Sequence, residues 1–233
     1  MRFLKIGPHS ELTLSKDLRT PPGPYAILSH TWGAEDDEVN FDDFEKEAGQ
    51  EKAGYIKLRF CAEQARADEL EYFWVDTCCI NKANTAELNE AITSMFRWYS
   101  EAAKCYVLLC DVSSHKRTLL GTGTPWQSML RTSRWFTRGW TLQELLAPRQ
   151  VEFYSREGDR LGDKNSLRHE IHKISHIPIE ALQGAPLSDF KVEQRLQWAS
   201  GRNTTREEDQ AYCLTGIFGV YMLPNYGEGS NAF

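Results

Sequence analysis

One short stretch of the chain joins an apolar run to residue types that can act on a small molecule. The segment SHTWG, residues 29–33, directly follows the apolar run YAIL. Ser29 and His30 can donate or accept hydrogen bonds, and Trp32 can stack on a planar ring. Gly33 lets the backbone approach a ligand closely. This combination indicates a strand that ends at a binding site.

Two carboxylates are further candidates. Asp76 ends the apolar run YFWVD and could bind a ribose hydroxyl, or it could cap a nearby turn through its side chain. Trp140 and Glu144 lie four residues apart in GWTLQEL, which places them on one face of a helix. Partial desolvation beside a large aromatic side chain could tune the pKa of Glu144. From these residues alone, a solvated Glu144 and a core Trp140 are the simpler interpretation.

Two other groups of residues could do chemistry, but each has a simpler explanation. Cys79 could be a nucleophile with His30 as its base, yet VDTCCI is more typical of buried thiols that follow a strand. His169, His172 and His176 share a helix face, but no fourth ligand is evident. We therefore predict no metal site.

Short apolar runs predict the strands that position these residues. The runs cover 25–29, 72–76, 105–109 and 151–155, and none alternates cleanly with polar residues, which is typical of buried parallel strands. Helical patterns over 55–70, 86–101 and 134–146 separate them, and Asn84 with Glu87 resembles a capping box. The polar segment 111–133, which contains GTGTP, predicts an exposed loop.

This alternation predicts an α/β fold, a parallel sheet flanked by helices. Such sheets bind ligands at the carboxyl ends of the strands, where the strand order reverses. We therefore expect the first and third of these strands to be adjacent, with residues 29–33 at that edge.

The last third of the chain has a helical character. Helical patterns cover 165–176, 189–200 and 206–218, and the last should begin at Thr204 or Thr205 with Glu207 or Glu208 as the capping partner. We predict an α/β core over residues 1–160 and a helical C-terminal subdomain over 161–233 packed on it.

Composition narrows the class of protein. With 233 residues, 41% of them hydrophobic, and 7 Trp, the chain should be globular. The net charge of -6 argues against a general nucleic-acid binder. No apolar run approaches the roughly 18 residues of a membrane span, and no secretory signal is visible. The 6 cysteines include no CxxC pair, which favours free, buried thiols in a reducing cytosol. We expect a cytoplasmic protein with no nucleic-acid or membrane partner.

Three blocks of the sequence, in this order, resemble the fungal heterokaryon incompatibility (HET) domain. They are YAILSHTWG, FWVDTCCINK and RWFTRGWTLQELLAP. The later segment TTREEDQAYCLTGIFGVYMLPNYGEG is similar to the one that commonly follows, so the resemblance covers essentially the whole chain. One departure is Lys82, which stands where the family often has Gln.

This resemblance implies a cytosolic effector of programmed cell death in fungal heterokaryon incompatibility and innate immunity. HET domains are often joined to NTPase and repeat modules that sense the trigger, and such a sensor could act here in cis or in trans. HET domains are also distantly similar to TIR domains, which are flavodoxin-like, often self-associate and in many cases cleave NAD. The fold expected from the resemblance is thus a TIR-like core over residues 1–160.

The TIR likeness also implies a site. In TIR domains a first-strand loop and a Glu in a WCxxEL-like helix form it, and GWTLQEL is similar, with Thr141 in place of Cys. The match carries the catalytic glutamate onto Glu144 and the aromatic onto Trp140, and the loop onto Ser29, His30 and Trp32. Gly33 and Asp76 complete the expected substrate-binding set.

We therefore expect NAD⁺ as the substrate, with no cofactor. The nicotinamide leaves as a neutral molecule and needs no general acid, so one carboxylate that stabilises the oxocarbenium-like charge can suffice. The alternative is a non-catalytic module that triggers death by self-association, because the fold alone does not fix the activity.

Overall fold

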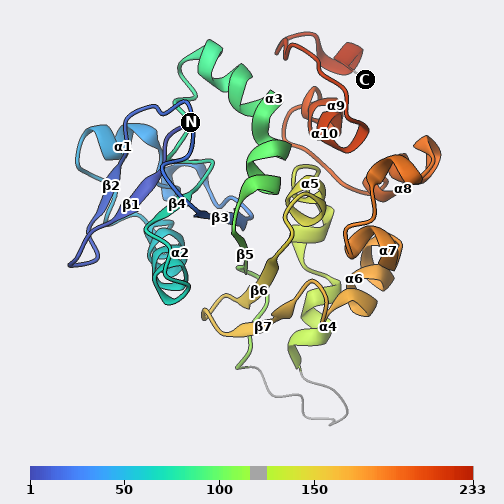
Figure 1. Cartoon of the computed structure of the whole chain (residues 1–233), viewed down its shortest axis with the longest axis horizontal. Coiled ribbons are helices and arrows are strands. Elements are labelled where there is room, and N and C mark those ends of the chain that lie inside the picture. The colour runs from blue at the N-terminus through green and yellow to red at the C-terminus, as the bar shows by residue number, and fades with distance from the viewer. Residues whose placement is uncertain (116–124, 233) are drawn as a thin grey trace.

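Residues 1–115 and 125–232, which a computed structural model describes, form one seven-stranded sheet flanked by helices (Figure 1). The strand order is β2-β1-β4-β3-β5-β6-β7. β4, β3, β5 and β6 are mutually parallel, whereas β1, β2 and β7 join the two edges in antiparallel pairing. The strands are β1 Leu4–Ile6, β2 Leu12–Leu14, β3 Tyr25–His30, β4 Tyr72–Trp74, β5 Lys104–Leu109, β6 Val151–Ser155 and β7 Arg160–Asp163. The predicted α/β fold is confirmed.

The prediction that the first and third apolar runs form adjacent strands is confirmed. β3 and β5 pair in parallel, with Ile27 opposite Cys105 and Ser29 opposite Val107. β4, which lies between them in the sequence, pairs with the other side of β3. The strand order therefore reverses at β3, and the carboxyl ends of β3 and β5 flank the switch point.

Helices cover both faces of the central strands, which explains why these strands read as continuous apolar runs. On one face, α2 (Tyr55–Ala67) brings Phe60 within 5.0 Å of the Tyr154 ring of β6. On the other face, α3 (Thr85–Glu101) and α5 (Thr141–Leu146) pack together, and Trp98 of α3 lies 5.6 Å from the Trp74 ring of β4.

The capping box predicted at the start of α3 is present only in part. The Asn84 side chain accepts hydrogen bonds from the amides of Ala86 and Glu87, so Asn84 is the predicted cap. The Glu87 carboxylate does not complete a capping box. It accepts a hydrogen bond from the amide of Asn81 and pairs with Arg2.

The C-terminal part is helical and packs beside α3 and α5, as the orange and red segments of Figure 1 show. Its helices are α6 Arg168–Ser175, α7 Ile179–Leu182, η3 Leu187–Asp189, α8 Val192–Ala199, α9 Asp209–Tyr212, α10 Thr215–Phe218 and η4 Gly229–Ala232. The remaining short helices are η1 Glu35–Asp37, α1 Phe41–Glu45, α4 Pro125–Arg131 and η2 Arg134–Thr137.

Several local predictions are wrong. β1, β2 and β7 are only three or four residues long, too short to give a periodic pattern, and β7 continues the core sheet beyond residue 160. α4 occupies part of the predicted loop 111–133, and most of its GTGTP motif lies outside the described residues. The predicted helix 134–146 is split into η2 and α5 because Arg138 forms a bridge with Asn203. The predicted helix 206–218 is two short helices, and Glu208, not a threonine, precedes the first.

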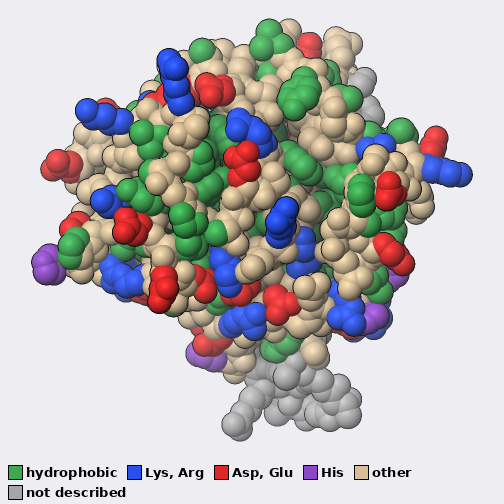
Figure 2. All heavy atoms as spheres, in the orientation of Figure 1, with side chains coloured by type: hydrophobic (Ala, Val, Ile, Leu, Met, Phe, Trp, Pro, Cys, Tyr) green, Lys and Arg blue, Asp and Glu red, His purple; other side chains and the backbone are tan. Residues whose placement is uncertain are grey.

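Three of the predictions drawn from composition can be compared with the structure. Every cysteine is a free thiol, as predicted, and all are buried except the half-buried Cys110. Within the described residues, no helix is long and apolar enough to span a bilayer. Basic and acidic side chains are interspersed on the face in Figure 2, so this face does not present the one-sign basic surface typical of nucleic-acid binders.

Candidate functional site

A cavity of about 220 Å³ lies at the carboxyl edge of the sheet, against β3, α3 and α5. Five of the seven residues predicted for the site line it: His30, Trp32, Asp76, Trp140 and Glu144. Their convergence follows from the topology, because β3, the segment after β4 and α5 all meet at the switch point. The other two predicted residues do not line the cavity, since Ser29 is fully buried and Gly33 is exposed outside it.

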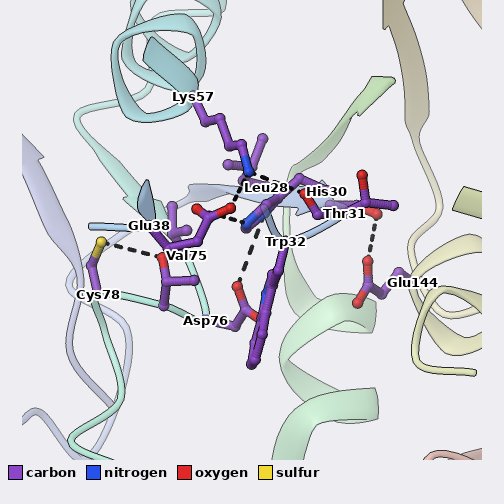
Figure 3. A network of polar contacts seen from close by, with 12 residues as sticks. Leu28, His30, Thr31, Trp32, Glu38, Lys57, Val75, Asp76, Cys78 and Glu144 are labelled. Atoms are coloured by element: carbon purple, nitrogen blue, oxygen red, sulfur yellow. Dashed lines mark hydrogen bonds and ion pairs between the residues drawn. The ribbon is translucent and has the colours of Figure 1, made fainter. Parts of the chain in front are cut away.

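Glu144 is a buried carboxyl group held by the core of the sheet. Only 6% of the residue is exposed, and its Oε2 accepts a hydrogen bond from the Ser29 hydroxyl of β3. The indole Nε1 of Trp135 donates to the same hydroxyl oxygen over 2.8 Å. Burial raises the pKa of Glu144 to about 8, against the ordinary 4.5, despite the hydrogen bond from Ser29. In Figure 3 the Glu144 side chain points from its helix toward the end of β3.

Ser29 therefore orients the candidate catalytic group instead of lining the cavity. It is fully buried, and its hydroxyl links Trp135 to Glu144 in a chain of two hydrogen bonds. Such a chain fixes the carboxyl in one position, because the serine oxygen accepts from one side and donates to the other.

His30, Asp76 and Trp32 form a second cluster on the wall, visible in Figure 3. Trp32 Nε1 donates to Asp76 Oδ2 over 2.9 Å, and His30 Nδ1 lies 4.0 Å from Asp76 Oδ1. Burial lowers the pKa of His30 to about 4, so its ring is neutral at physiological pH. Within the described part of the chain, His30 Nε2 and Asp76 Oδ1 are buried without a hydrogen-bond partner. His30 Nε2 faces the Glu38 carboxylate, 3.9 Å from its Oε2, so Asp76 Oδ1 is the better placed of the two atoms for a polar ligand.

A buried ion pair, which the sequence did not reveal, supports this wall. The Glu38 carboxylate pairs with Lys57 of α2 and accepts a hydrogen bond from the Gly33 amide over 2.6 Å. Lys57 Nζ also donates to the Thr31 carbonyl over 3.1 Å. The pair, drawn as Lys57 and Glu38 in Figure 3, thus holds residues 31–33 in place. The Gly33 amide is already bonded to Glu38 and is not available to a ligand.

Basic side chains surround the mouth of the cavity. Lys82 Nζ lies 3.8 Å from the Trp32 ring centroid, and Arg138 Cζ lies 5.6 Å from it. Trp32 is 38% exposed. A ligand that stacks on its ring must therefore displace these cations or bind next to them. Lys82, the position that departs from the family pattern, is therefore at the site.

The C-terminal region also contributes to the cavity. Arg206, Asp209 and Tyr226 line it, and the Arg206 guanidinium lies 4.4 Å from the Tyr226 ring centroid. Burial raises the pKa of Asp209 above its ordinary value. We did not predict these residues. The sequence signal for them was the block TTREEDQAYCLTGIFGVY, whose likeness to the family suggested a fixed place relative to the core.

The two weaker alternatives have no support in the geometry. Burial raises the pKa of Cys79 to about 12, so its thiol is protonated and a poor nucleophile. His172 Nδ1 is bonded to the Ile177 carbonyl over 2.8 Å, and His176 ends α6 in a left-handed conformation. Over residues 1–115 and 125–232, no three His, Cys, Asp or Glu side chains are arranged to hold a metal ion.

Comparisons with known proteins agree with the resemblance seen in the sequence blocks. Residues 25–124 match the family described as heterokaryon incompatibility protein (HET). The chain is 55% identical over 232 residues to the vegetative incompatibility protein HET-E-1 of Podospora anserina. That alignment covers 98% of this chain but 17% of the relative, so the chain spans about a sixth of the length of the curated relative it matches. No solved structure matches the chain.

Proposed function

Because this chain carries a heterokaryon incompatibility domain, we propose that it acts in vegetative incompatibility as an effector of programmed cell death. We further propose that it does so by hydrolysing the N-glycosidic bond of NAD⁺, which releases nicotinamide and ADP-ribose. One observation carries the enzymatic part of the proposal. A buried carboxyl, Glu144, is fixed by Ser29 beside a cavity at the switch point of the sheet.

The proposed chemistry needs one negative charge near the ribose. As the bond to nicotinamide breaks, positive charge develops on the ribose ring, and the Glu144 carboxylate stabilises it. Nicotinamide leaves without a proton because its ring nitrogen was cationic in NAD⁺. Water then adds to the sugar carbon and loses one proton to solvent, which gives ADP-ribose. Asp76, which lines the cavity and whose Oδ1 lacks a hydrogen-bond partner within the described residues, is suited to a ribose hydroxyl.

The raised pKa of Glu144 fits a site for a cationic ring. In the empty cavity the carboxyl is largely protonated at neutral pH, since burial raises its pKa to about 8. A nicotinamide cation beside it favours the ionised form, so binding of NAD⁺ releases a proton to solvent. Proton uptake or release on binding can be measured by calorimetry in buffers of different ionisation enthalpy.

The size and charge of the cavity fit one end of a dinucleotide. The volume of about 220 Å³ is smaller than the about 300–1,000 Å³ typical of small-molecule sites, so we propose that only the nicotinamide riboside end of NAD⁺ enters the cavity. The phosphates of NAD⁺ would then lie at the mouth, where Lys82, Arg138 and Arg206 can neutralise them.

The test is release of nicotinamide by the purified chain. Glu144→Gln keeps the side-chain volume but removes the charge, and loss of such an interaction lowers the rate by about 10²–10³-fold. The matched control is Glu63→Gln, because the Glu63 side chain is 67% exposed on α2. Equal nicotinamide release by the parent and Glu144→Gln would refute catalysis at this residue.

The alternative function is a non-catalytic module that signals death by self-association. A run of exposed apolar residues favours it: Val220, Tyr221 and Leu223, which follow α10, are 48%, 90% and 82% exposed. Under this alternative, Glu144→Gln still triggers death in a fungal host, whereas Tyr221→Ser with Leu223→Ser does not. Under the enzymatic proposal, Glu144→Gln abolishes death together with NAD⁺ cleavage.

We propose that a sensor module brings several copies of this domain together. The chain spans only a sixth of its relative, which leaves room in such a protein for further modules. The proposal expects weak activity from the isolated domain and a rise in activity per molecule with concentration. Activity that stays proportional to concentration, from a monomer throughout, would contradict it.

A further inference from the structure

A second and larger cavity lies on the other side of α5 from the candidate site. Its volume is about 780 Å³, within the about 300–1,000 Å³ range of small-molecule sites. The wall is formed by the end of α5, the turn after β7, the α7–η3 segment, α8 and α10. This cavity has no part in the function proposed above.

All charged side chains that line this cavity are basic. Arg149, Lys164 and Arg195 line the cavity, and no Asp or Glu is among its described lining residues. Within the described part of the chain, none of these three cations forms an ion pair with a carboxylate, although such pairs are frequent elsewhere on the molecule. The wall therefore carries positive charge that the protein itself does not neutralise.

Lys164 is buried and Arg195 is half-buried, and burial makes an unpaired charge costly. Lys164 is only 5% exposed, and its Nζ donates to the carbonyls of Leu145 and Pro148 over 3.2 and 2.6 Å. These two bonds leave one of its three N–H donors free. Burial also lowers the pKa of Lys164 to about 8.

Arg195 is the second of these cations. One of its terminal nitrogens donates to the Ile217 carbonyl over 3.0 Å, and the guanidinium lies 4.7 Å from the Phe218 ring centroid. Its Nε is buried, and no described atom accepts a hydrogen bond from it. Guanidinium and ammonium groups that line one cavity without a carboxylate partner can bind a phosphate or carboxylate there.

Apolar side chains form a further part of the wall, among them Phe96, Leu182, Leu187 and Phe218. We propose that this cavity binds a small organic anion, whose phosphate or carboxylate group contacts Arg195, Lys164 and Arg149 while its apolar part packs against these side chains. A bound anion supplies the negative charge that the wall lacks. The ligand class is thus distinct from the cationic ring proposed for the cavity beside Glu144.

The experiment measures binding of phenyl phosphate and of benzoate to the full chain by isothermal titration calorimetry. Phenyl phosphate tests the phosphate form of the anion and benzoate the carboxylate form. We expect saturable binding of at least one probe. Arg195→Gln and Arg149→Gln should each raise the dissociation constant about 10- to 100-fold, the effect of losing a charge-assisted hydrogen bond.

Two matched variants locate the binding. Arg59→Gln removes a positive charge from the exposed face of α2, and Arg206→Gln removes one from the cavity beside Glu144. Both should bind the probe like the parent. No saturable binding of either probe, or equal weakening in Arg206→Gln or Arg59→Gln, would overturn the proposal. Arg149 is exposed, so its substitution tests the cavity even if Arg195→Gln does not fold.

Discussion

Replacing Glu144 by Gln is expected to stabilise the folded protein at alkaline pH, although it removes the proposed catalytic group. The residue is 6% exposed, and burial raises its pKa from 4.5 to about 8. At about 1.4 kcal/mol per pKa unit, this difference corresponds to an upper limit of about 5 kcal/mol for ionising Glu144 in the folded state. Gln avoids this cost because it cannot ionise, and its side-chain oxygen can still accept a hydrogen bond from Ser29.

The stabilisation by Glu144→Gln should grow as the pH rises. The folded protein keeps a proton that the unfolded chain releases above about pH 4.5, so the neutral carboxyl contributes its full stability below that pH. This contribution is lost as the pH rises toward the folded pKa of about 8. The free energy of unfolding of Glu144→Gln, relative to the parent, should therefore increase with pH between these two values.

Urea unfolding of both proteins, at steps from about pH 5 to pH 8.5, measures this difference. Glu63→Gln, on the exposed surface of α2, controls for the general effect of removing a carboxylate. Effects of other titrating groups, such as His30, are shared by parent and variant and cancel in the difference. If the difference stays constant with pH, Glu144 titrates as it does in the unfolded chain, and the argument from burial is refuted.

Three further outcomes are expected. Burial lowers the pKa of His30 from 6.5 to about 4, so the free energy of unfolding of the parent should fall by about 3 kcal/mol as the pH drops from 6.5 to about 4. Acid unfolding of His30→Asn should lack this loss. The same loss in parent and variant would contradict the argument from burial. Adding a reductant should leave the melting temperature unchanged because every cysteine is a free thiol, whereas a fall would reveal a disulfide. Trp135→Phe removes the indole donor to Ser29 and should lower the free energy of unfolding by about 1–3 kcal/mol. Urea unfolding of parent and variant measures this difference. Equal free energies would show that this hydrogen bond does not stabilise the fold.

The central strands and the gathering of the site could be predicted because their signals are local. Residues 25–30 form an apolar run followed at once by polar groups, and this pattern alone indicates a buried strand that ends at a site. The switch-point rule predicted residues 29–33 at this edge, and the likeness to TIR domains added Glu144. His30 and Glu144 both line one cavity.

The supporting contacts could not be predicted because they join residues far apart in the sequence. Lys57 lies in a helix that the sequence does indicate, yet only the fold brings it to Glu38 and Thr31. Arg206 and Asp209 reach the cavity through the packing of the C-terminal helices, which no local pattern specifies. The short edge strands, such as β2, depend on pairing with a neighbour more than on their own residues.

The hydrogen-bonded chain from Trp135 through Ser29 to Glu144 makes the candidate site part of the hydrophobic interior, since Trp135 and Ser29 are completely buried. Under the proposed function, a genetic screen for strains that escape cell death would recover two kinds of substitution at these positions that have the same phenotype. Substitutions at Trp135 or Ser29 lower the amount of folded protein as well as its activity, whereas Glu144→Gln should leave abundance intact. Immunoblots of the escaping strains therefore separate the two kinds, and only the abundant, inactive class identifies residues that act on the ligand itself.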